Sequence, residues 1–62
     1  MNNNHDMEPD VLAETENFGF AVWRNFEEED GYVYHIELGG LTLHFSAEEW
    51  EELVVLIRNA SA

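Results

Sequence analysis

Two histidines, His35 and His44, are the residues of this chain whose type and spacing could support chemistry. Imidazole is the commonest metal ligand in proteins, and it titrates near neutral pH. Two imidazoles alone seldom hold a metal, so a divalent ion would need a third ligand from Glu37, from an acid of the N-terminal segment or from a second copy. We expect a polar cross-strand pair on an open sheet surface. A weak divalent-metal site and a pH-sensitive contact are the alternatives.

Ser46 is the other side chain that invites a chemical interpretation, because it follows His44 closely. The sequence shows neither an acid that would orient a base nor a donor for an oxyanion. It contains no cysteine and no glycine-rich phosphate loop. A chain of 62 residues also leaves little room for a substrate cleft. We therefore expect no enzymatic activity, no catalytic residue and no cofactor.

The charge balance narrows the classes of partner. Two arginines and no lysine stand against 14 acidic residues, which gives a net charge of −12 at pH 7. Such a surface repels nucleic acid phosphates and anionic membranes, so we expect neither direct nucleic acid binding nor membrane association. It suits a basic protein partner or a salty cytoplasm, in which ions screen the repulsion. An acidic decoy that mimics DNA and binds a basic nucleic-acid-binding protein is one alternative function.

Chain length and apolar content limit the stability of the fold and indicate the cellular location of the protein. A chain of 62 residues buries only about 60% of the surface that its unfolded form exposes, and no disulfide can compensate here. The longest apolar run, Leu53 to Ile57, is too short to span a bilayer. The polar first ten residues show no secretory signal, so we expect a cytoplasmic location.

Alternation of apolar and polar residues predicts an antiparallel sheet. Three segments alternate at the period of a strand: FGFAVWRNF (18–26), YVYHIEL (32–38) and LTLHF (41–45). The acidic stretch EEEDG (27–31) is expected to form a solvated turn between the first two. Gly39-Gly40 joins the last two, and we expect a type I′ hairpin because glycine allows positive φ at both positions.

The N-terminal part is less regular. Residues 1–10 lack periodicity, and we expect them to form a disordered acidic tail ahead of a single small domain over residues 11–62. The stretch VLAETEN (11–17) is either a further strand or an extended arm that lies along the sheet.

A helix is expected to follow Ser46. The spacing of Ser46 and Glu49 predicts a capping box, in which each side chain bonds the backbone of the other residue. On a helix that turns about 100° per residue, four apolar side chains form one stripe: Trp50, Leu53, Val54 and Ile57. The fold class is therefore α+β, of order β-β-β-α, with a three-stranded or four-stranded antiparallel meander and one C-terminal helix packed on one face.

The hairpin also determines which residues share a face of the sheet. A two-residue turn pairs Leu38 with Leu41, and hence His35 with His44. The face without the helix then carries an aromatic and polar mixture, with Glu37 beside it: Ala21, Trp23, Val33, His35, Thr42 and His44. Exposed patches of this kind often mark interfaces. We expect a small acidic interaction module that forms homodimers through this face; the alternative for Trp23 is that the N-terminal segment folds over it.

Three stretches of the chain resemble a known group of sequences: VLAETEN (11–17), YHIELGGLTLHF (34–45) and EEWEEL (48–53). The group consists of short acidic proteins of cyanobacterial type that are described as uncharacterised. The resemblance implies a small soluble intracellular protein with no assigned activity, and it transfers no functional residue to this chain.

Overall fold

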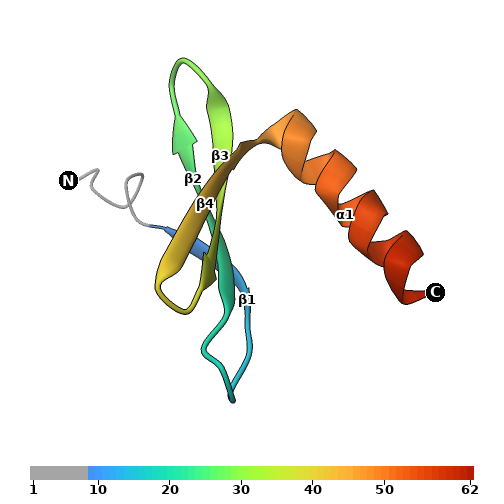
Figure 1. Ribbon diagram of the computed structural model, residues 1–62. Helices are drawn as coiled ribbons and strands as arrows, with labels where there is room; N and C mark the ends of the chain where they lie inside the picture. The colour runs from blue at the N-terminus through green and yellow to red at the C-terminus, as the bar shows by residue number, and fades with distance from the viewer. Residues whose placement is uncertain (1–8) are drawn as a thin grey trace.

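The computed structural model describes residues 9–62, in which four strands precede one helix (Figure 1). The elements are β1 (Asp10–Glu14), β2 (Ala21–Glu27), β3 (Gly31–Leu38), β4 (Leu41–Ser46) and α1 (Ala47–Ser61). Each strand pairs antiparallel with the next strand in chain order, so the sheet is a meander. The predicted α+β class is confirmed, and the segment 11–17 does contribute a strand, as far as Glu14.

The structure describes only part of the expected N-terminal tail. Residues 1–8 of the segment 1–10 lie outside the described residues. Asp10 belongs to β1, where it pairs with Arg24 of β2. The ordered sheet therefore begins at Asp10, one residue before the predicted domain boundary.

The register of the last hairpin follows the prediction, although the turn type does not. Leu38 pairs with Leu41, and the next pairs follow in step. Gly39 has a φ of +66°, whereas Gly40 lies outside the left-handed region. A positive φ at the first central position alone matches a type II′ turn, so the expected type I′ turn is wrong. Both types close a two-residue loop, which is why the register is unaffected.

Alternation divides the sheet into two faces of different chemistry. Tyr34 of β3 stacks on Trp50 of α1, with ring centroids 4.9 Å apart and ring planes 4° from parallel. The face that carries Tyr34 is therefore the helix side. His35, the next residue, points to the other side and stacks on Trp23 of β2.

The helix begins at the predicted capping box. The Ser46 hydroxyl accepts a hydrogen bond from the Glu49 backbone N–H over 3.1 Å, and the Glu49 carboxylate accepts one from the Ser46 N–H over 2.8 Å. Glu48 also lies in the first turn and Arg58 in the last, where each charge opposes the partial charge of the helix end. A cap of this kind stabilises a helix by about 1 kcal/mol.

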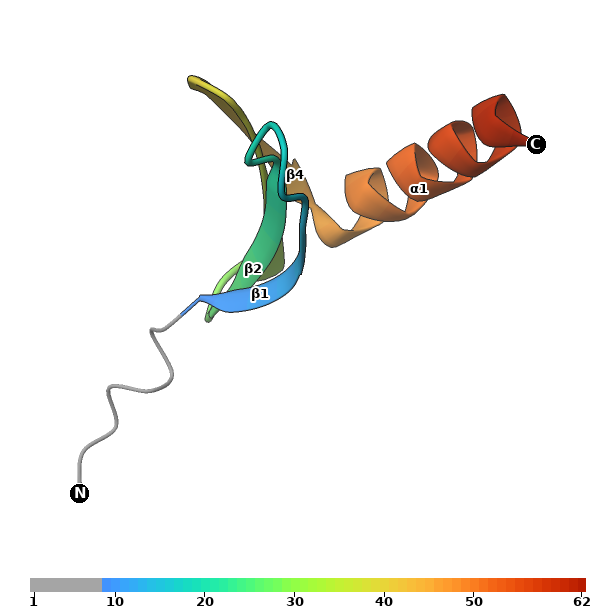
Figure 2. The ribbon, with the colours of Figure 1, turned by 90° about the horizontal axis from the view of Figure 1, so that it is seen from below.

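After this start, α1 leans away from the sheet (Figures 1 and 2). The helix lies against β3 and β4 and does not reach β1 or β2. Figure 2 shows it projecting from one side of the sheet, with its C-terminal end farthest away. Among the described residues no apolar side chain is buried, and His35 is the one buried polar side chain. The helix therefore lies on one face, as predicted, but the space beneath it stays open.

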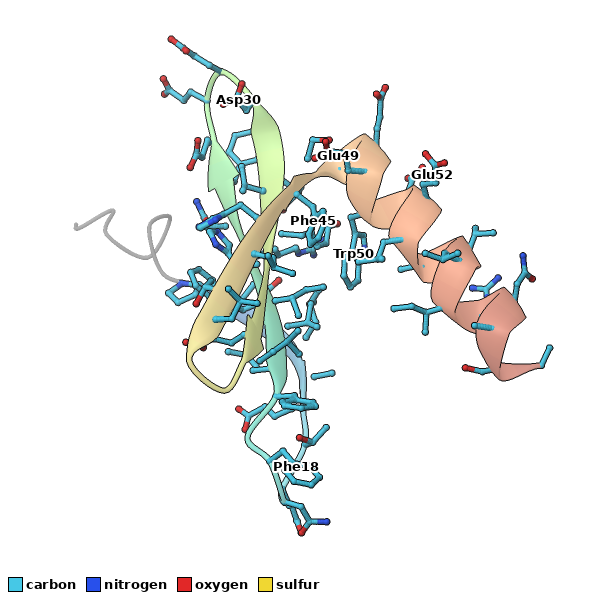
Figure 3. The ribbon with its side chains drawn as sticks, viewed as in Figure 1. Phe18, Asp30, Phe45, Glu49, Trp50 and Glu52 are labelled. Carbon is cyan, nitrogen blue, oxygen red and sulfur yellow. The ribbon has the colours of Figure 1, made fainter. Side chains whose placement is uncertain are left out.

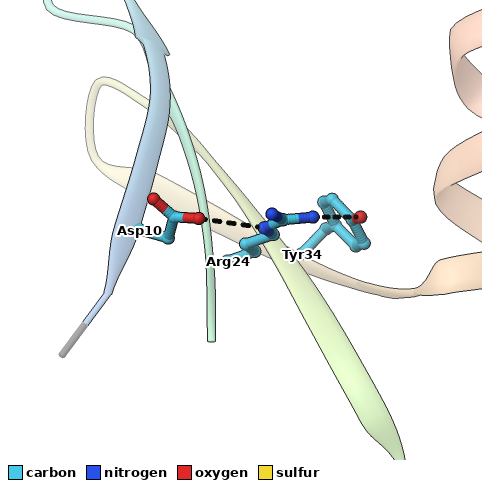
Figure 4. Close-up of polar contacts among 3 residues, drawn as sticks. All are labelled: Asp10, Arg24 and Tyr34. Carbon is cyan, nitrogen blue, oxygen red and sulfur yellow. Dashed lines mark hydrogen bonds and ion pairs between the residues drawn. The ribbon is translucent and has the colours of Figure 1, made fainter. Parts of the chain in front are cut away.

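A series of polar and aromatic contacts links the edge strand β1 to the helix α1. Figure 4 shows the part of it that runs from Asp10 to Tyr34. Arg24 Nε donates to Asp10 Oδ2 over 3.1 Å, and Arg24 Nη1 donates to Tyr34 Oη over 3.2 Å. The hydrogen bond to Tyr34, followed by the bond to Asp10, raises the pKa of the Arg24 guanidinium above its usual value. The guanidinium carbon also lies 4.2 Å from the centre of the Tyr32 ring. Because Tyr34 stacks on Trp50, β1 is linked through β2 and β3 to α1.

The diglycine turn gives a matched pair of substitutions. Gly39→Ala places a Cβ at a φ of +66°, and we expect it to lower the free energy of unfolding by about 1–2 kcal/mol. Gly40→Ala has no such strain and meets no atom within 4 Å of the new Cβ, so it should be neutral or slightly stabilising. Denaturant unfolding at one protein concentration measures both. Equal losses for the two variants would contradict the turn geometry.

Candidate functional site

The predicted face exists as a row of rings across three strands. We call it the histidine face; its members are Ala21, Trp23, Val33, His35, Thr42 and His44. Within it, Trp23 pairs with His35, and His35 pairs with His44. The Trp23 and His35 rings are stacked, with centroids 3.8 Å apart and planes 5° from parallel. The His44 ring meets the His35 ring nearly edge-on at 4.5 Å.

The remaining members flank this row. Ala21 and Thr42 both pair with Glu37, which is exposed. Val33 pairs with Asn25 on the other side of the row. The structure therefore groups the six predicted residues on neighbouring positions of β2, β3 and β4.

Asn25 is a functional neighbour that the sequence prediction missed. Its Oδ1 lies 2.7 Å from His35 Nε2, and its amide group is diagonal to His35 across the strand pair. Diagonal residues of paired strands are within reach of long or ring-shaped side chains. The signal was available in the sequence, because Asn25 alternates in phase with Trp23.

His35 is far more buried than a residue of an open face, with only 8% of its surface exposed. The contact with Asn25 Oδ1 assigns the ring proton to Nε2, because an amide oxygen only accepts. Nδ1 is then left as a buried acceptor without a hydrogen-bond partner. Burial lowers the pKa of His35 below its ordinary value of 6.5, the neighbouring His44 lowers it further, and Glu27 acts in the opposite direction.

The same geometry disfavours a divalent-metal site at His35 and His44. His35 Nδ1 has no exposed surface, and Nε2 is engaged with Asn25. A metal would therefore bind His35 only after its ring leaves the stack with Trp23. Within residues 9–62 no group of three or more potential ligands gathers around one point.

The burial of His35 predicts how its ring titrates. The folded pKa lies below the unfolded value of 6.5, so folding favours the neutral ring. The resulting stabilisation is complete above pH 6.5 and is lost as the pH falls through the folded pKa. We expect the His35 ring signals to show a midpoint below 6.5 by NMR. His44→Gln should raise this midpoint only in part, because burial is the larger cause; a wild-type midpoint at or above 6.5 would contradict the burial.

The second surface is an apolar groove between α1 and the helix side of the sheet (Figure 3). The α1 stripe forms one wall, and side chains of β1, β2 and β3 form the other. We call this surface the apolar groove; its main lining residues are Ala13, Phe20, Val22, Ile36, Leu38, Trp50, Leu53, Val54 and Ile57. Glu14, Thr15 and Ala21 border it as well, and its volume is about 210 Å³. Both apolar stripes were predicted, but they were expected to close on each other as a core.

Acidic side chains gather at one end of the molecule in the labelled view. Figure 3 places Asp30 of the β2–β3 turn, together with Glu49 and Glu52 of α1, toward the end opposite Phe18. Glu14 lies elsewhere, at the border of the apolar groove. The acids are thus grouped in part and scattered in part, and the acidic-decoy function stays a prediction.

Comparison with protein families, with characterised proteins and with solved structures finds no match for this chain. The resemblance to short acidic proteins of cyanobacterial type likewise stays a prediction. In the part of the chain that the structure describes, no helix has the length and apolar character needed to cross a bilayer.

Proposed function

We propose that this protein is a small interaction module that self-associates, and that two copies join through the apolar groove. One observation carries the proposal: among the described residues no apolar side chain is buried, although two apolar stripes face each other across the groove. A chain this short has little stability to spare. A second copy that covers the groove would supply the burial that a single copy lacks.

The exposed apolar area approaches the area that a small interface needs. Six large side chains of the helix side and of α1 keep 37–62% of their surface exposed: Phe20, Leu38, Leu41, Leu43, Leu56 and Ile57. With about 150–200 Å² for a fully exposed large side chain, they leave roughly 400–600 Å² open. Half-buried Trp50, Leu53 and Val54 add to this area. A standard interface buries about 800 Å² on each partner and a small one about 600 Å², so these side chains would supply most of the area that one partner contributes to a small interface.

The histidine face is the weaker candidate for the interface. Trp23 is half-buried, and it already covers His35, while Asn25 satisfies one nitrogen of the same ring. These contacts use the groups that a partner would otherwise bind. Self-association through this face remains the alternative, and it makes a different prediction for substitutions on β4.

Neighbouring residues of β4 separate the two surfaces. Leu43 pairs with Ile36 of the groove wall, whereas Thr42 belongs to the histidine face; both are exposed. We expect Leu43→Gln to weaken the dimer at least about tenfold in sedimentation equilibrium, because interface anchors contribute more than 1 kcal/mol. Thr42→Gln, the matched control, should change the dissociation constant less than about twofold. The reverse pattern would favour the histidine face, and a monomer at every concentration would overturn the proposal.

Ionic strength provides a separate test, because each copy carries a net charge of −12. The Debye length shortens from about 30 Å at 0.01 M salt to about 8 Å at 0.15 M. Repulsion between two copies therefore weakens as salt rises, and we expect the dimer to become tighter. A basic partner would show the opposite dependence, since salt screens its attraction to the acidic surface. An association that weakens with salt would contradict self-association.

This role requires neither a catalytic residue nor a cofactor, and it places no demand on a membrane. The absence of enzymatic activity and the cytoplasmic location therefore remain predictions that accompany the proposal. A weak divalent-metal site at His35 and His44 is not favoured by the sheltered nitrogens of His35.

A further inference from the structure

We infer that the element that covers the apolar groove is α1 of a second copy, so that each helix packs against the uncovered part of its partner's sheet and alongside its partner's helix. The inference rests on the proposed self-association and names the element that makes it. It follows from three features of α1: the width of its apolar arc, its departure from the sheet and the distribution of its charges.

The apolar arc of α1 is wider than one contact surface needs. At about 100° per residue, the apolar positions from Leu56 through Trp50 to Ala47 span about 180° of the helix surface. A helix that packs on one surface uses an arc of about 100°. Leu56 at the edge of the arc is 62% exposed and Ile57 within the arc is 54% exposed, so much of the arc is uncovered in a single copy. A helix with this arc can contact a sheet on one side and another helix on the other, which are the two walls of the groove.

The departure of α1 from the sheet leaves a place for such an occupant. The helix of one copy lies against β3 and β4 and leaves β1 and β2 without a helix above them. Phe20, which directly precedes β2, and Val22 of β2 line the open groove there. A helix of 15 residues is about 22 Å long, and α1 therefore has the length to extend across a sheet. The second α1 would cover the β1–β2 half of the helix side.

The two-fold symmetry of the proposed dimer limits the assembly to two copies. In a two-fold dimer the same patch serves both partners, so laying α1 of one copy over the groove of the other covers both grooves at once. No groove is left open to recruit a third copy. The complex is therefore expected to stop at the dimer rather than to grow into a filament.

The charges of α1 favour an antiparallel arrangement of the two helices. Glu48, Glu51 and Glu52 lie outside the apolar arc in the N-terminal half, and Arg58 lies in the last turn. Glu49 falls within the arc, but the Ser46 backbone N–H binds its carboxylate. Antiparallel helices place Arg58 of each copy near the acidic half of the other. Parallel helices would place the acidic halves side by side, which like charges oppose.

Intermolecular NOEs between isotope-labelled and unlabelled copies test the inference at moderate salt. We expect contacts from the methyl groups of Leu56 and Ile57 in one copy to the Phe20 ring and the Leu38 methyl groups in the other. A dimer whose intermolecular contacts lie on the histidine face, with none between α1 of one copy and the β1–β2 half of the other, would overturn the inference and leave self-association intact. A chain that stays monomeric would overturn both the inference and the proposed function.

Two neighbouring substitutions on α1 provide the second measurement. Leu56 lies at the edge of the apolar arc, whereas Val55 points away from it although half of its surface is exposed. Leu56→Gln should raise the dimer dissociation constant at least about tenfold, and Val55→Gln should leave it within about twofold. Helical circular dichroism of both variants verifies that α1 is retained. Equal effects of the two substitutions would show that α1 is not the occupant of the groove.

Discussion

The alternation of side chains across the β3–β4 hairpin is the constraint on which the rest of the structure depends. With Leu38 opposite Leu41, every second residue of β4 joins the helix side, and His44 joins His35 on the other side. A slip by one residue would place His44 beneath α1 and would expose the leucines of β4. The turn that sets this register depends on one positive φ, at Gly39. Both the apolar groove and the histidine face are consequences of that turn.

The two faces of the sheet differ in how completely their side chains are packed within one chain. On the histidine face, Trp23 stacks on His35 and Asn25 binds Nε2 of its ring, so a buried polar residue has one of its two ring nitrogens hydrogen-bonded. On the helix side, the stack of Tyr34 on Trp50 fixes only the start of α1. Beyond it the apolar stripes diverge (Figure 3). The sheet is thus complete by itself, whereas the contact between sheet and helix is incomplete within one chain.

Local signals determined what the sequence could predict. The capping box at Ser46 and the pairing of His35 with His44 follow from cap spacing and loop length, and both were confirmed. Alternation located the three strands, although the first begins at Ala21 rather than at Phe18. The open angle of α1 depends on contacts between distant residues, which no short pattern encodes. The position of Arg24 was missed for a related reason: a cation on an apolar beat finds its partners, Asp10 and Tyr34, only once three strands are aligned.

A net charge of −12 and an uncovered apolar groove are physically compatible in one small protein. Charge on the outer surface of α1 keeps copies apart in any orientation that brings those surfaces together. The groove offers one orientation in which apolar area is buried while most acids face solvent. In the proposed dimer, repulsion would disfavour nonspecific association more than the specific contact. The acidic surface would then select the geometry in which the apolar groove of the proposed dimer is covered.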